Sequence, residues 1–120
     1  MTRSLVLLPA LLWWGLSLWL LLKPAGSPSP IPHFDKIGHF ALFGVQAGLL
    51  GWGLHRCGVT RPRLTALLCC ALWAGLSEGL QAWLTVDRAA EWLDALADMA
   101  GAGAVLGILG SYIARAGKAV

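Results

Sequence analysis

The feature that most constrains this chain is an uncharged, largely apolar run over residues 5–22, bounded by Arg3 and Lys23. As a helix at 1.5 Å per residue, a run of this length is about 27 Å long, which is close to the thickness of the hydrocarbon layer of a bilayer. The run resembles a secretory signal peptide, but signal h-regions are shorter, at about 7–15 residues. We therefore expect an uncleaved first transmembrane helix.

The rest of the chain continues this pattern. Apolar residues make up 58% of it and charged residues only 12%, whereas globular domains carry about 25% charged residues. Residues 24–33 are rich in proline and cannot be helical. This composition predicts a stiff linker outside the membrane. The sequence predicts an all-α, four-transmembrane-helix bundle as one domain over residues 1–120, with helices at about 5–22, 36–54, 64–85 and 94–114.

Lysine and arginine predict the orientation. Four spans place the N-terminus, the loop near residues 55–63 and the C-terminus on one side. That side carries six basic residues and the other carries three, namely Lys23, Lys36 and Arg88. The positive-inside rule then predicts cytoplasmic termini and an extracytoplasmic linker.

The charge distribution and the cysteine spacing argue against nucleic-acid binding, a disulfide framework and a CxxC metal site. The net charge of +3 comes from basic residues scattered at helix ends, where they meet lipid headgroups, so we expect no nucleic-acid partner. The three cysteines form neither a disulfide framework nor a CxxC metal motif.

Glycines four residues apart occur in each of the last three predicted helices: Gly44 with Gly48, Gly75 with Gly79, and Gly103 with Gly107. Small residues at this spacing let helices approach closely in lipid. We expect all three pairs to pack helices within one molecule.

All six acidic residues fall on the side opposite the termini. Helical spacing groups five of them, all except Asp87, with other polar side chains into three sets, one per helix: Asp35, Lys36 and His39; Glu78 and Gln81; and Glu91, Asp94 and Asp98. These sets should converge at one depth.

Glu78 is the most informative of these residues, because an acid flanked by apolar residues at membrane depth must be paired, protonated or hydrated. A structural hydrogen bond between helices would also explain it. Asp35 has a structural alternative as a helix cap, and Asp87 and Glu91 have one as a solvated helix start.

The same residues resemble the VanZ-like family of small bacterial membrane proteins. Asp35-Lys36-Ile37-Gly38-His39 is similar to the family's D-K-x-x-H motif, and Glu78-x-x-Gln81 is followed by Arg88. Asp94-x-x-x-Asp98-x-x-Gly101 is similar to D-x-x-x-N-x-x-G, except that Asp98 stands where the family usually has asparagine.

The resemblance implies a VanZ-like fold, the bacterial cytoplasmic membrane and an envelope role, since the family's named member is associated with resistance to the glycopeptide teicoplanin. We expect a lipid headgroup, envelope precursor or glycopeptide-type molecule to bind at the outer polar site. The candidate ligand-binding residues are Asp35, Lys36, His39, Glu78, Gln81, Arg88, Asp94 and Asp98.

Three alternatives stay open. A membrane hydrolase or transferase would use His39 with Glu78, Asp94 and Asp98 as an acid–base set, or His39, Glu78 and Asp98 as metal ligands. Another alternative is a transport subunit, and a further one is that the polar residues form a structural network. The sequence identifies no catalytic residue, cofactor or oligomeric state.

Overall fold

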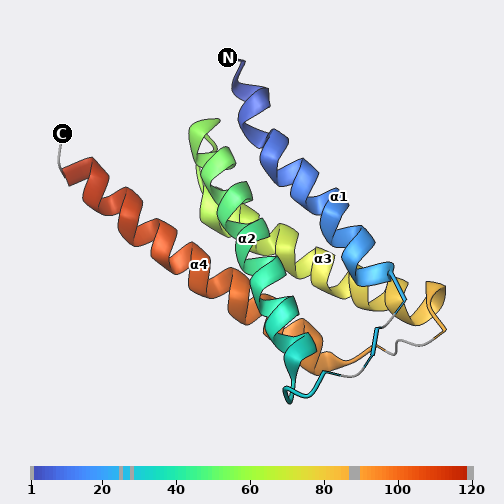
Figure 1. Ribbon diagram of the computed structural model, residues 1–120. Helices are drawn as coiled ribbons and strands as arrows, with labels where there is room; N and C mark the ends of the chain where they lie inside the picture. Colours follow the sequence, from blue (N-terminus) through green and yellow to red (C-terminus); the bar gives the residue numbers. More distant parts are fainter. Residues whose placement is uncertain (1, 25, 28, 87–89, 119–120) are drawn as a thin grey trace.

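The computed structural model describes residues 2–24, 26–27, 29–86 and 90–118 of the chain. A 3-10 helix, η1 (Arg3–Leu7), leads directly into α1 (Leu8–Leu22), and α2 (Phe34–Arg56), α3 (Pro62–Leu84) and α4 (Trp92–Lys118) follow. The described residues contain no strand. Both ends of the chain lie toward one end of the molecule, as Figure 1 shows.

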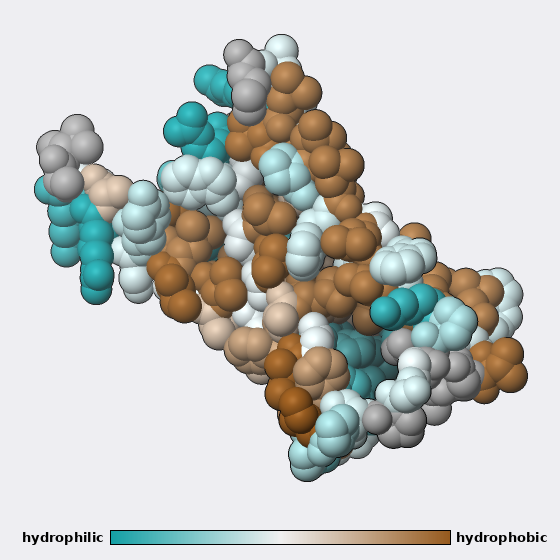
Figure 2. All heavy atoms as spheres, viewed as in Figure 1, coloured by the Kyte–Doolittle hydropathy of each residue, from teal (hydrophilic) through white to brown (hydrophobic). Residues whose placement is uncertain are grey.

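All four helical segments are long and apolar enough to cross a membrane, the first of them comprising η1 and α1 together. The prediction of an all-helical chain with four membrane-capable helices is therefore confirmed. In Figure 2, hydrophobic side chains cover most of the middle of the molecule. Such side chains can face lipid, whereas their exposure to water would be unfavourable.

α2 and α4 extend beyond their predicted bounds at both ends, most of all α4, which covers 92–118 rather than 94–114. α3 begins two residues before its predicted start and ends one residue before its predicted end. The end of a helix depends on local turn geometry more than on hydropathy. His33 adopts a left-handed conformation with φ of 55° just before α2, and Pro62 opens α3 as its first residue. The capping alternative for Asp35 is wrong, because Asp35 lies inside the first turn and the helix has no side-chain cap.

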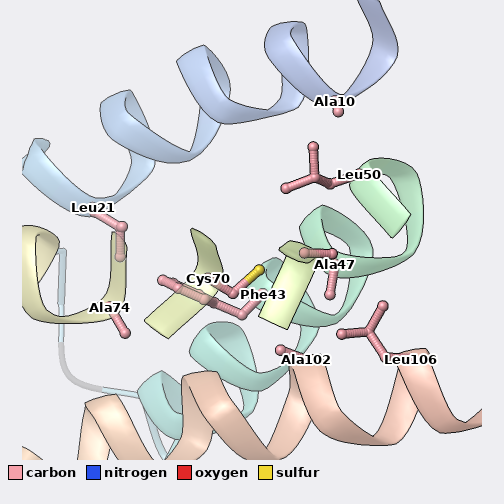
Figure 3. Packing of buried hydrophobic residues seen from close by; sticks show 10 residues of the cluster. Ala10, Leu21, Phe43, Ala47, Leu50, Cys70, Ala74, Ala102 and Leu106 are labelled. Atoms are coloured by element: carbon pink, nitrogen blue, oxygen red, sulfur yellow. The ribbon is translucent and has the colours of Figure 1, made fainter. Parts of the chain in front are cut away.

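The core is built mostly from small and medium side chains of all four helices, together with the large side chain of Phe43. α2 is the central helix and contacts η1, α1, α3 and α4. Figure 3 shows the buried cluster, which comprises Ala10, Leu21, Phe43, Ala47, Leu50, Ala66, Cys70, Ala74, Ala102 and Leu106. Six of these ten residues are alanine or cysteine, and their short side chains let the helices pack closely.

Glycines make the largest interface, between α2 and α4, possible. A Cβ atom on Gly44 or Gly48 would meet Val105 of α4, and one on Gly101 would fall on the backbone carbonyl of Phe40. The packing prediction is thus confirmed for Gly44 and Gly48.

The same prediction is wrong for the other two glycine pairs. A Cβ atom on any of their four members would meet nothing within 4 Å: Gly75, Gly79, Gly103 and Gly107. These glycines lie on exposed faces of α3 and α4. Spacing alone cannot tell which face of a helix meets a neighbour.

Polar side chains attach α1 to the other helices. Trp13 Nε1 donates to the Leu42 carbonyl of α2 at 3.0 Å, and Gln81 Nε2 of α3 donates to the Leu21 carbonyl at 2.8 Å. Hydrogen bonds of this kind join helices where the surroundings offer no water. They fix α1 beside α2 and α3.

Candidate functional site

Polar side chains from α2, α3 and α4 meet near the end of the bundle opposite the termini. We call this set the polar cluster: Asp35, Lys36, His39, Glu78, Glu91, Asp94 and Asp98. The first three lie in the opening turns of α2 and the last two in the opening turns of α4, while Glu78 comes from the closing part of α3. The predicted convergence of three helices is therefore confirmed.

Lys36 organises the outer part of the polar cluster. Its Nζ atom lies 2.8 Å from Asp35 Oδ2, 2.6 Å from Glu91 Oε2 and 2.5 Å from Asp94 Oδ1. The Asp35 side chain is 59% exposed and that of Asp94 only 9% exposed. The contacts with Asp35 and Glu91 are hydrogen bonds and the contact with Asp94 is an ion pair, so Lys36 joins α2 to the start of α4.

His39 and Asp98 form the inner part. His39 Nδ1 lies 2.7 Å from Asp98 Oδ1, and His39 Nε2 lies 3.6 Å from Asp94 Oδ2. Asp98 is completely buried and His39 is 5% exposed. The short contact requires a proton between the two groups, and it ties α2 to α4 at a depth where breaking it would leave a buried group unpaired.

Glu78 reaches this cluster from α3 and is 8% exposed. Its Oε2 atom accepts a hydrogen bond of 3.0 Å from the backbone N–H of Glu91, just before α4. Glu78 thus helps to fix the start of α4. A structural hydrogen bond was the alternative role that the sequence indicated for Glu78. Its second oxygen, Oε1, is buried and accepts no hydrogen bond from the residues described.

The remaining predicted site residues lie apart from this cluster or outside the described chain. Gln81 is 2% exposed, and its amide is used on α1 rather than on the acids. Arg88 and Asp87 lie outside the described residues. Glu91 was not among the predicted ligand-binding residues, yet it pairs with Lys36. The spacing of three residues between Glu91 and Asp94 was the sequence signal for Glu91.

A cleft of about 900 Å³ opens beside the polar cluster. Trp13, Leu20, Leu42 and Val45 line its apolar part. Its polar part is formed by Lys23, His33, Asp35, His39, Gln81, Glu91 and Asp94. Figure 2 shows hydrophilic surface in a hollow toward this end of the molecule, bordered by hydrophobic side chains.

The chemistry of the site is that of hydrogen-bond acceptors and of a histidine paired with a carboxylate. Such a set can accept hydrogen bonds from a ligand, bind a cation or exchange protons. The hydroxyl nearest to Glu78 in sequence gives no support to a nucleophile, because Ser77 Oγ is buried and donates to the Ala74 carbonyl of its own helix at 3.1 Å.

Comparison with known proteins adds no relative, since no family model, curated protein or solved structure matches the chain. A function for this chain is therefore inferred from its own residues and their geometry.

Proposed function

We propose that this chain is a VanZ-like protein of a bacterial cytoplasmic membrane that binds an amphiphilic envelope molecule. The apolar part of the ligand would lie in the cleft between α1 and α2, and its headgroup would contact the carboxylates of the polar cluster. The observation that carries this proposal is a cleft whose lining changes along its length from tryptophan and leucine to aspartate and histidine.

The size and place of the cleft fit such a ligand. Its volume of about 900 Å³ falls within the range of roughly 300–1,000 Å³ that is usual for small-molecule sites. Its apolar part lies along α1 and α2. Both α2 and the segment formed by η1 and α1 are long enough to span a bilayer, so an acyl or prenyl chain could enter from the lipid. The polar part lies near the helix ends, where a headgroup would reside.

The polar part favours a headgroup that carries hydrogen-bond donors. Asp35, Glu91 and Asp94 present acceptor oxygens along the cleft, and ionised carboxylates only accept. Lys36 already contacts three carboxylates, and Lys23 Nζ lies over the Trp19 ring at 5.5 Å from its centroid, which argues against the use of these lysines as phosphate ligands. Sugar hydroxyls or an amine are therefore the headgroup chemistry that we propose.

Filling the apolar part of the cleft tests this proposal. Ala41 is exposed and lines the cleft, so Ala41→Trp should exclude an alkyl chain without disturbing the core. We expect native mass spectrometry of gently extracted protein to show a lipid-mass adduct on the wild type and at least a roughly tenfold smaller adduct fraction on this variant.

The matched control is Ala71→Trp, which places the same side chain at an exposed position of α3 that does not line the cleft. This variant should keep the adduct. The proposal fails if the folded wild type carries no adduct, or if both tryptophan variants lose it equally.

The proposed orientation places the cleft on the extracytoplasmic side, because the Lys and Arg excess lies on the side of the termini. Cys57 follows α2 at that end, and Ser29 lies in the linker at the other. In a background lacking Cys69 and Cys70, we expect a membrane-impermeant maleimide to label Ser29→Cys in intact cells. Cys57 should react only after the membrane is opened, and the reverse pattern would refute this orientation.

A further inference from the structure

Three donor groups from three helices approach one point inside the polar cluster. His39 of α2, Glu78 of α3 and Asp98 of α4 each offer one ligand atom, and these atoms all lie within 4.8 Å of one another. Two ligands of a single zinc-sized ion stand about 3–4 Å apart, given bonds of about 2.0–2.2 Å. The observed spread is close to that of a metal site.

The two carboxylates have oxygen atoms that the described protein does not satisfy. Asp98 Oδ2 and Glu78 Oε1 are both buried without a hydrogen-bond partner among the described residues. Their other oxygens are used, by His39 and by the Glu91 backbone respectively. An unsatisfied carboxylate oxygen away from water is unfavourable, and coordination to a cation would offset that cost.

Charge leads to the same conclusion. The polar cluster holds five carboxylates but only Lys36 and His39 as basic groups. The three ion pairs of Lys36 are all with the outer acids Asp35, Glu91 and Asp94. Among the residues that the structure describes, Glu78 and Asp98 therefore have only His39 as a basic group nearby, and a divalent ion would balance these two buried negative charges while His39 is neutral.

We infer that His39, Glu78 and Asp98 bind one divalent transition-metal ion where α2, α3 and α4 meet. One imidazole nitrogen with two carboxylates suits zinc, manganese or iron(II), whereas magnesium and calcium prefer oxygen ligands alone. Asp94, 3.6 Å from His39 Nε2, would help to orient the ring. His39 Nδ1 would then bind the ion, and the proton that it shares with Asp98 would be released to water. The ion enters through the cleft, which His39 and Asp94 line. This site does not require the amphiphile of the proposed function.

The test measures metal binding directly. Protein without a histidine tag is stripped with a chelator and titrated with Zn²⁺, Mn²⁺ and Co²⁺ in mild detergent. We expect about one equivalent to bind to the wild type and at least about tenfold weaker binding to Glu78→Gln and Asp98→Asn. Asp35→Asn is the matched control, since it removes the same charge from the exposed edge of the cluster and should change affinity less than about twofold.

Two results would overturn the inference. One is folded wild type that holds less than about a tenth of an equivalent at saturating metal; the other is an equal loss of affinity in Asp35→Asn and Glu78→Gln. Should the inner variants not fold, the absorption spectrum of Co²⁺-loaded wild type decides. A spectrum of nitrogen and oxygen ligands supports the site, and a strong thiolate-to-cobalt band would assign the ion to the cysteines instead.

Discussion

Gly101→Val should prevent the chain from reaching its native fold, with a loss of at least about 3 kcal/mol in unfolding free energy. A Cβ atom at this position would overlap the carbonyl of Phe40, which is backbone and cannot rotate away. The helices α2 and α4 would have to separate, and their interface is the most extensive one in the molecule. The yield of monodisperse protein and the midpoint of SDS-induced unfolding would measure this effect.

Gly103→Val is its matched control. It makes the same change two residues along α4, where a Cβ atom meets nothing within 4 Å. We expect this variant to unfold within about 0.5 kcal/mol of the wild type, as surface substitutions usually do. Equal behaviour of the two variants would contradict the close approach of α4 to Phe40.

His39→Phe should lower the unfolding free energy by about 3–5 kcal/mol, because it removes the partner of a fully buried carboxylate. Asp98 is 0% exposed, and its 2.7 Å contact with His39 Nδ1 joins α2 to α4. The comparison is made with chelator present, so that bound metal does not contribute to stability. Unfolding in mild detergent, followed by tryptophan fluorescence, gives the free energies.

A double-mutant cycle separates this pair from general damage. Adding Asp98→Leu to His39→Phe removes the stranded carboxylate, so the double variant should be more stable than His39→Phe alone. Additive losses would show that the two side chains do not interact. Recovery of stability without recovery of ligand or metal binding would separate the structural role of the pair from its role in a site.

Much of the fold follows from local sequence. The run over 5–22, the prolines of the linker and Pro62 together indicate four helices long enough to span a membrane. Hydropathy and proline act through the nearest residues, so no knowledge of tertiary contacts is needed. The predicted helix ends were less accurate. For example, His33 precedes α2 in a left-handed conformation that hydropathy does not encode.

The candidate site was predictable as a set of helix faces but not as a set of contacts. Spacings of three and four placed Asp94 and Asp98 on one face of α4, and Lys36 and His39 on one edge of α2. They did not assign partners. The structure pairs Lys36 with Asp94, and His39 with Asp98, and so separates an outer ion-paired layer from an inner buried one.

The sequence by itself determined the number of membrane-capable helices and the end of the bundle where the acidic residues gather, because both depend on composition and position along the chain. Only the tertiary structure decided which glycines meet a neighbour. It also decided which acids are buried, and that Gln81 serves α1 rather than the polar cluster. Those outcomes depend on how each helix is rotated about its axis against the others, and that rotation is set by packing over the whole bundle.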